Sequence, residues 1–419
     1  MYVSPVRGRS LDGAAAPRRR WTYAADLLES AVVAQAGRDS GNFLPGNKPR
    51  VSVPLMEQGG VRIAFSVLYS AFDEFAPAAG WTSTLKRFPR GYRTSRRYAP
   101  TLPSAGATAS LTLGLLNASE PPRRGAFGRL IRRLENVERY VDRHYDGRAA
   151  FAHDPAELEQ ILAAGRIALI HCVEGGFHLG AEPAEVQESV RVLARRGVAY
   201  ITLGHLYHRG VATVAPAIPY LSERDHELLF PQPQQGLTSR ARSAIATMVE
   251  EGILLDLCHL SEQALEETFE LLDDIDPDRT VPVIASHTAT RLGSQQYNLH
   301  PANIDRIAAR GGVIGLILAT HQLADGCSEI SRDQGGLEAL FQHVEQIAAV
   351  TGGHRYTAIG SDLGGFIEPL PGFPSVASLG TLRDELEHRY GREEAGLIAG
   401  ENVKRLLTTA WRLGPTPRD

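Results

Sequence analysis

The chain has 419 residues, of which 43% are hydrophobic and 22% are charged. This is an ordinary globular composition, and the length is sufficient for one large domain or two smaller ones. The net charge of −4 is small for this length, which argues against binding nucleic acid or an anionic membrane through overall charge. No apolar run reaches the roughly 18 residues that a membrane span needs.

The cysteines and the N-terminal sequence both bear on the compartment. Cys172, Cys258 and Cys327 form neither a CxxC pair nor a disulfide framework, which is typical of a reducing compartment. Residues 1–20 contain consecutive arginines, but no apolar segment follows them. We therefore predict a disordered leader rather than a secretion signal, and a cytoplasmic protein.

Short apolar or β-branched runs alternate with amphipathic segments of helical length along most of the chain. This alternation is typical of a parallel sheet with crossover helices. In chain order, the predicted strands are 21–28, 61–67, 167–176, 198–205, 252–259, 281–287, 311–318 and 356–362. Eight strands in this pattern predict an α/β fold, namely a (β/α)8 TIM-type barrel in a single domain over residues 21–415.

The segment 76–150 interrupts this pattern. It is rich in Arg, Gly and Pro at first and becomes helical over residues 127–145. We interpret it as an insertion between strands two and three of the barrel rather than as a separate domain.

Five of the predicted strands end in a polar residue of the type that binds metals or transfers protons. These residues are Glu174, His205, His259, His287 and Asp362. The carboxyl ends of barrel strands converge on one mouth, so five such residues in register predict a functional site there. Imidazoles together with a carboxylate suit zinc, which activates water and polarises a carbonyl while a nearby carboxylate takes the proton. The pattern therefore predicts a hydrolase.

Lysine is scarce, and this excludes one design of metal site. The chain has only three lysines, Lys48, Lys86 and Lys404, and none follows a middle strand of the predicted barrel. A carboxylated lysine cannot then bridge two ions. Glu174 is the remaining candidate for a bridge, and the two glycines after it allow close approach of backbone and ligand.

Five motifs in the same order resemble those of the renal (membrane) dipeptidase family, the M19 metallopeptidases of the amidohydrolase superfamily. They are "VEGG" (173–176), "YITLGH" (200–205), "DLCHLS" (256–261), "PVIASHT" (282–288) and "AIGSDLGG" (358–365), and the resemblance covers roughly residues 22–410. It implies a bridging metal ligand at Glu174 and ligands of the second (β) metal at His259 and His287. It further implies a substrate-carbonyl or oxyanion contact at His205 and a general base at Asp362.

The sequence departs from this family at the first predicted strand. The family has an HxD pair there, which ligates the first (α) metal, but Leu28 and Ser30 fall where that pair would align. We therefore expect one zinc ion, held at the β-type site by Glu174, His259 and His287. Asp26 or Glu29 remains open as a substitute ligand.

Two further departures concern the substrate. The family places an arginine near "YNLHP" (297–301) to hold the substrate's terminal carboxylate, and Tyr297 occupies that position. Tyrosine lacks the charged, forked guanidinium, so we expect Tyr297 to line a modified substrate site, with Arg291 as a candidate replacement. In "GSDLGG" a glycine also stands where the family usually has a second aspartate.

The sequence thus predicts a metal-dependent hydrolase that cleaves an amide or peptide-like bond of a small molecule. Two alternatives remain open: a catalytically silent homologue that acts as a binding or scaffold protein, and a non-hydrolytic single-metal enzyme such as a lyase or cyclase. Fold and ligands do not separate these, because the reaction depends on the pocket. A homodimer is compatible with the sequence.

Overall fold

The computed structural model describes residues 43–44, 48–69, 74, 125–218, 222–327, 336–365 and 367–411. Its main sheet follows the order β10-β9-β8-β7-β6-β5-β3, with β4 also paired to β5, and every pairing within it is parallel. The strands are β3 (Ile63–Leu68), β4 (Ala149–Phe151), β5 (Ile167–Glu174), β6 (Tyr200–Thr202), β7 (Leu254–Asp256), β8 (Val283–Thr288), β9 (Val313–Leu316) and β10 (Thr357–Ile359). A separate antiparallel pair consists of β1 (Phe43–Leu44) and β2 (Lys48–Pro49).

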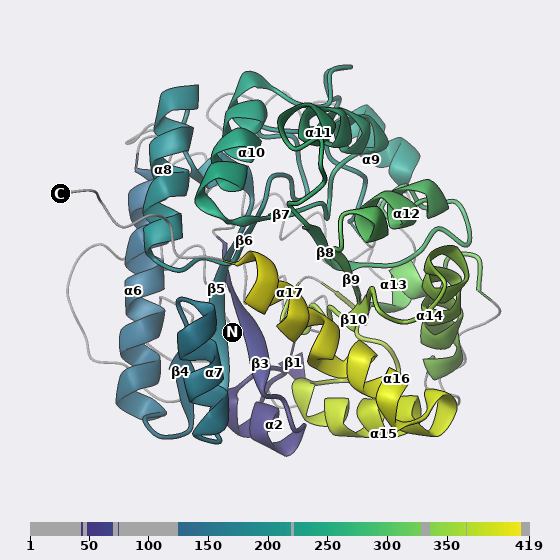
Figure 1. Ribbon diagram of the computed structural model, residues 1–419. Coiled ribbons are helices and arrows are strands. Elements are labelled where there is room, and N and C mark those ends of the chain that lie inside the picture. The colour runs from purple at the N-terminus through teal and green to yellow at the C-terminus, as the bar shows by residue number, and fades with distance from the viewer. Residues whose placement is uncertain are drawn as a thin grey trace.

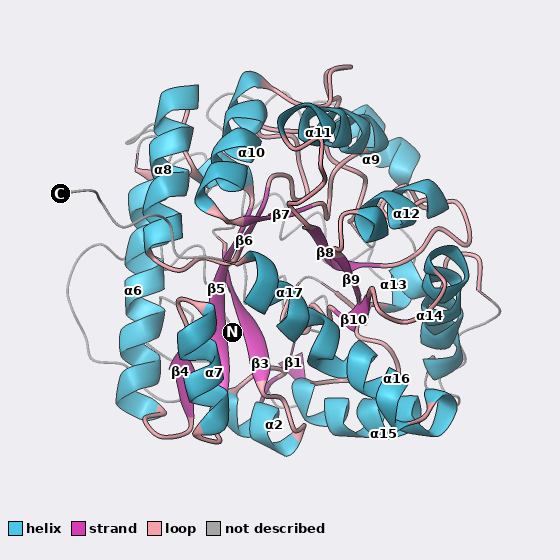
Figure 2. Ribbon diagram, viewed as in Figure 1, coloured by secondary structure: helices cyan, strands magenta, loops and turns pink. Residues whose placement is uncertain are grey.

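Helices surround the curved sheet (Figures 1 and 2). The α-helices are α2 (Val53–Gln58), α6 (Ala126–His144), α7 (Pro155–Ala163), α8 (Pro183–Arg195), α9 (Glu223–Leu229), α10 (Ser239–Glu251), α11 (Glu262–Ile275), α12 (Pro301–Ala309), α13 (Thr320–Leu323), α14 (Leu337–Thr351), α15 (Leu379–Tyr390), α16 (Arg392–Gly396) and α17 (Asn402–Ala410). Short 3₁₀ turns occur at η1 (Gly176–His178) and η2 (Val376–Ser378), and a π-helical turn, η3 (Leu397–Glu401), joins α16 to α17.

Seven of the eight predicted strands are confirmed as β3 and β5–β10, and the α/β class is confirmed with them. The predicted first strand, 21–28, lies outside the described residues, as do the leader and Asp26, Leu28, Glu29 and Ser30. Strand β4 was not predicted. It pairs with the start of β5, Ala149 opposite Ile167, so the end of the predicted insertion contributes to the sheet.

The side chains inside the sheet form an apolar layer with a polar layer above it. Six strands and α17 contribute the apolar layer, which consists of Cys172, Tyr200, Leu254, Ile284, Val313, Ala358 and Leu406. Side chains two positions apart on a strand point to the same face. Glu174, Thr202 and Asp256, two residues after members of the apolar layer, therefore also face inward, at the carboxyl ends of their strands.

Helix caps fix where the chain leaves the sheet. Ser261 is the N-cap of α11, and its hydroxyl accepts a hydrogen bond from the backbone N–H of Ala264. Thr238 caps α10 in the same way, and Gly252 ends that helix in the left-handed conformation with φ 75°. These caps fix both ends of the segment that carries β7 and His259.

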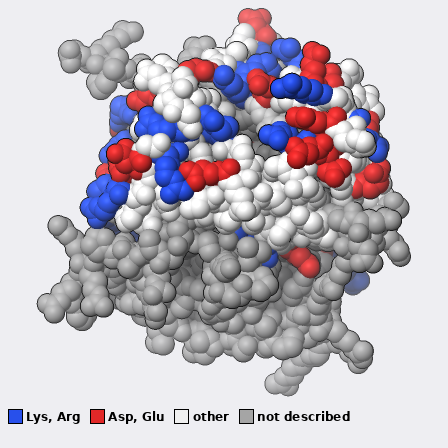
Figure 3. All heavy atoms as spheres, turned by 90° about the horizontal axis from the view of Figure 1, so that it is seen from below, with Lys and Arg blue, Asp and Glu red and all other residues white. Residues whose placement is uncertain are grey.

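Two further observations concern membrane-spanning helices and the distribution of surface charge. None of the described helices is long and apolar enough to cross a membrane. On the described part of the face in Figure 3, acidic and basic side chains are interspersed rather than segregated by sign.

Candidate metal centre

Glu174 is the centre of a cluster of histidines at the carboxyl end of the sheet. It is the last residue of β5, and its Oε1 lies 3.4 Å from Nε2 of His259 and 3.4 Å from Nε2 of His287. The two Nε2 atoms are 2.9 Å apart. These three side chains, predicted from the sequence as metal ligands, therefore point their donor atoms at one another.

His287 reaches the centre through an irregularity in β8. The register between β8 and β9 shifts between Ala285 and Thr288, at Ser286 and His287. Gly315 and Gly360 make room for this bulge, because a Cβ atom at either position would lie only 2.2 Å or 1.9 Å from the carbonyl oxygen of Ser286. These two glycines thus permit the backbone path that turns His287 toward Glu174.

His259 follows β7 in a tight turn rather than within the strand. Its φ is 66°, a left-handed conformation that costs free energy in a residue other than glycine and is often found at functional sites. The ring of Tyr297 packs edge-on against the His259 ring, with centroids 5.1 Å apart. The side chain is buried, with 5% of its surface exposed.

The donor spacing fits a metal ion. Zinc–nitrogen bonds of about 2.0–2.1 Å in a tetrahedral arrangement separate the ligand atoms by roughly 3.3 Å. The three separations at Glu174, His259 and His287, between 2.9 and 3.4 Å, are close to this value. One carboxylate and two imidazoles also match zinc chemically, since they leave at least one position open.

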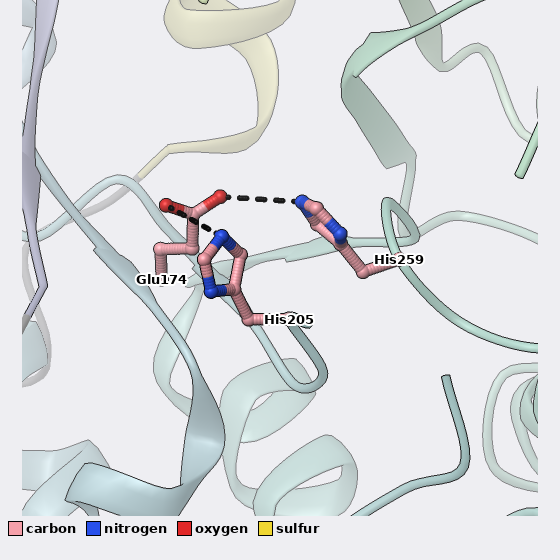
Figure 4. A group of neighbouring side chains, drawn as sticks. All are labelled: Glu174, His205 and His259. Atoms are coloured by element: carbon pink, nitrogen blue, oxygen red, sulfur yellow. Dashed lines mark ion pairs between the residues drawn. The ribbon is translucent and has the colours of Figure 1, made fainter. Parts of the chain in front are cut away.

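His205 approaches the opposite oxygen of Glu174. Its Nε2 lies 3.7 Å from Glu174 Oε2, as Figure 4 shows. The candidate ligand atoms of Glu174, His205 and His259 all lie within 4.8 Å of one another. Two sets of three donors therefore share Glu174 and His259, one completed by His287 and the other by His205.

Glu74, which was not predicted, holds His205 in place. Its fully buried carboxylate accepts a 2.6 Å hydrogen bond from Nδ1 of His205, so Nε2 of the ring faces Glu174. The backbone N–H groups of Leu206 and Tyr207 donate to its other oxygen, at 2.8 and 3.1 Å. Such a carboxylate behind an imidazole is typical of histidines in metal sites.

Burial and neighbouring charges shift the pKa values of the groups around the centre. Burial alone would raise the pKa of the Glu174 carboxyl, but the neighbouring histidines His205, His259 and His287 hold it well below its usual range. Burial lowers the pKa of His259 to about 4, which favours the neutral imidazole that binds metals. For His205, burial is outweighed by the carboxylates of Glu74 and Glu174, which raise its pKa to about 9.

Asp362 lies beside these groups at the end of the β10 segment. Burial raises the pKa of its carboxyl to about 6, with Glu174 acting in the same direction and His287 and His205 opposing it. Its φ of 51° is again left-handed. Gly365 leaves space for its side chain, because a Cβ there would lie 2.2 Å from Asp362 Oδ1. No described residue donates a hydrogen bond to this carboxylate.

Tyr297 and Arg291, the predicted substrate contacts, are engaged with the protein itself. The hydroxyl of buried Tyr297 donates a 2.7 Å hydrogen bond to the carbonyl of His287. The guanidinium of Arg291 donates to the carbonyls of residues 295, 296 and 298 and pairs with Glu262. Both residues therefore support the loop beside the centre, and their contact with a substrate stays a prediction.

Asp256, Cys258 and His287 form a second group with metal-ligand chemistry. The Asp256 oxygens, however, accept hydrogen bonds from Thr202, Cys258 and Ser286. Burial raises the pKa of the Cys258 thiol well above its ordinary value, and its sulfur already accepts the His287 backbone N–H. We therefore interpret this group as a support of His287 rather than as a site of its own.

Comparison with known proteins identifies the family. The membrane dipeptidase family, peptidase family M19, matches residues 54–414. The chain belongs to the M19 family. It is 24% identical over 269 residues to dipeptidase tcpJ of Claviceps purpurea, an alignment that spans 63% of this chain and 56% of that protein. The chain therefore spans little more than half the length of this relative.

Solved structures of M19 proteins share the fold. The probable dipeptidase PvdM from Pseudomonas aeruginosa superposes with a TM-score of 0.59 at 15% identity, covering 91% of this chain and 98% of that one. A metallopeptidase from Rhodobacter sphaeroides, solved with a phosphinate mimic of the dipeptide L-Ala-D-Ala, gives 0.57 at 20% identity and covers 92% and 97%. The predicted TIM-type barrel and the predicted family are thus confirmed.

Proposed function

We propose that this M19 protein is a metal-dependent hydrolase that cleaves an amide or peptide-like bond of a small substrate. The observation that carries the proposal is the convergence of three donor atoms, from Glu174, His259 and His287, beside the carboxylate of Asp362. The family is metal-dependent, and two of the relatives named above are called a dipeptidase and a probable dipeptidase. A single zinc ion at this β-type position is the simplest occupant.

Each residue has a separate task in the proposed reaction. Glu174, His259 and His287 hold the ion, which when bound supplies a Lewis acid that activates water and polarises the substrate carbonyl. Asp362 accepts the proton of the attacking water, since its oxygens are not engaged by described residues. His205, with Nδ1 bound to Glu74, presents Nε2 to the substrate carbonyl oxygen.

The proposed substrate is a peptide-like small molecule other than a common free dipeptide. Tyr297 stands where an arginine would hold a terminal carboxylate, and a desolvated, unpaired carboxylate is costly in a pocket. The hydroxyl of Tyr297 is already bound to the carbonyl of His287, so it offers a substrate little without breaking that bond. A substrate without a free carboxylate at this end avoids the cost.

Elemental analysis of protein purified without chelator tests the metal centre. We expect about one zinc ion per chain and its loss in His259→Ala or His287→Ala, because three protein ligands are close to the minimum for tight binding. His205→Ala should keep the ion if His205 contacts the substrate. Loss of zinc from this variant would instead make His205 a ligand, and two ions per chain would contradict the single-ion proposal.

Asp362→Asn tests catalysis on a panel of amide, lactam and dipeptide substrates. Shape and zinc content should be preserved, while turnover falls by roughly 10²-fold or more because the base is lost. Asp384→Asn is the matched control, since Asp384 is an exposed carboxylate on α15 that pairs with Arg383. If the zinc-loaded protein turns over no member of the panel, a catalytically silent homologue becomes the better explanation.

A further inference from the structure

We propose that Asp256 and Ser286 act as positioning residues that fix which nitrogen of His287 faces the metal centre and so set the affinity for the ion. The inference rests on the proposed metal site. Ser286 Oγ lies 2.7 Å from His287 Nδ1 and 2.6 Å from Asp256 Oδ2. A carboxylate, a hydroxyl and an imidazole thus form one chain that ends on the side of the ring facing away from Glu174.

The direction of the hydrogen bonds follows from the number of protons. The Ser286 hydroxyl has one proton, which it donates to Asp256. Its oxygen must therefore accept the bond from His287 Nδ1–H, and in the neutral ring the lone pair is then on Nε2. Nε2 is the atom that lies 3.4 Å from Glu174 Oε1 and 2.9 Å from His259 Nε2.

Asp256 can direct this chain because it is itself held rigidly. It is completely buried and accepts four hydrogen bonds from three separate segments. Thr202 Oγ1 on β6 donates at 2.5 Å, the backbone N–H of Cys258 at 3.2 Å, and the backbone N–H of Ser286 at 2.9 Å, in addition to the Ser286 hydroxyl. The orientation of His287 is therefore tied to strands β6, β7 and β8 together.

Cys258 and Tyr297 also hold the backbone of His287. The Cys258 sulfur accepts the backbone N–H of His287 at 3.1 Å, and the Tyr297 hydroxyl donates to the His287 carbonyl at 2.7 Å. The backbone of His287 is therefore held on both sides independently of the Ser286 hydroxyl. Removing that hydroxyl should leave the His287 ring free to rotate and to carry its proton on either nitrogen, while the backbone keeps its place.

The test compares Ser286→Ala with Thr202→Val. Both remove a hydroxyl that donates to the same Asp256 oxygen, but only the first touches His287. Zinc affinity is measured by competition with a chromophoric chelator, with melting temperature as the check on folding. We expect Ser286→Ala to bind zinc about 10–100-fold more weakly, the usual effect of losing such a partner. Thr202→Val should lose much less zinc affinity, because three donors still hold Asp256 and the Ser286–His287 hydrogen bond is kept. Equal affinities for all three proteins, or equal losses in both variants, overturn the inference.

A spectroscopic measurement on the unmodified, metal-free protein tests the tautomer directly. In ¹⁵N-histidine-labelled protein, with His287→Gln providing the assignment, we expect the neutral His287 ring to carry its proton on Nδ1 rather than on Nε2. A proton on Nε2 overturns the inference even if zinc binds tightly. If the unmodified protein shows the expected tautomer but binds no zinc, the proposed function fails together with the affinity part of the inference, while the hydrogen-bonded chain stands.

Discussion

Replacing Gly360 by alanine should damage both the stability and the metal centre of the protein. A Cβ at this position would lie 1.9 Å from the carbonyl oxygen of Ser286 and 2.9 Å from its carbonyl carbon. Non-bonded atoms of this kind stay about 3.0 Å apart or more, so the oxygen would have to retreat by about 1 Å. Ser286 cannot retreat freely, because Asp256 holds both its N–H and its hydroxyl.

The cost can be estimated from these contacts. Overpacking of this kind costs about 1–3 kcal/mol, which for a domain of this size lowers the melting temperature by roughly 1–4 °C. Because His287 follows Ser286, we expect zinc affinity to fall by about tenfold or more in the same variant. Calorimetry and chelator competition measure the two effects.

Gly396→Ala is the matched control for Gly360→Ala. Gly396 is helical, with φ −60° and ψ −43°, and a Cβ there would lie 4.0 Å from Glu401 Cγ, an ordinary van der Waals contact. This variant should keep its zinc affinity and be as stable as the unmodified protein or slightly more so, since alanine favours helix over glycine. Equal behaviour of the two variants would refute the steric argument at Ser286.

Two further predictions concern groups that support the site and the sheet. Glu74→Ala should lower the free energy of unfolding by about 3 kcal/mol or more, because it leaves the His205 ring and two buried backbone N–H groups without their acceptor. Urea denaturation measures this effect, and a change below about 1 kcal/mol would contradict the prediction. Glu138 raises the pKa of His153 to about 9, a value above the ordinary 6.5. The His153–Glu138 ion pair therefore stabilises the folded protein fully below pH 6.5, and this contribution is lost as the pH rises through 9. We expect this contribution to the free energy of unfolding to be about 1 kcal/mol or less after solvent screening. Melting curves across this pH range measure it, and His153→Gln should not show the loss of stability with rising pH.

Much of the fold could be predicted because its strands carry a strong local signal. Buried parallel strands are nearly continuous apolar runs, and β5 and β9 are of this kind. Strand β4, Ala149–Phe151, has only three residues and no such signal, and it exists because it pairs with the first residues of β5. The predicted strand ends were also too long at β6 and β7, since His205 and His259 lie in turns beyond them.

The site could be predicted only in part, because the supporting residues belong to no strand-end pattern. Glu74 lies outside every predicted element, and nothing near it in the sequence connects it with His205, 131 residues later. Asp256 did carry a signal: a carboxylate inside the apolar run "GILLDLC" must be buried, and a buried carboxylate needs several donors. Which donors it finds depends on the register of β6, β7 and β8, which the sequence does not show.

The position of Tyr297 connects substrate choice to the metal centre. Its ring packs against His259 and its hydroxyl supports the His287 carbonyl, so it touches two of the three proposed ligands. Arg291 in turn holds the carbonyls on both sides of Tyr297. An arginine at position 297 would gain a charge for a substrate carboxylate but lose the ring contact and the support of His287. In the proposed metal centre, Tyr297 therefore helps to keep two ligands in place, and we expect it not to bind a terminal carboxylate.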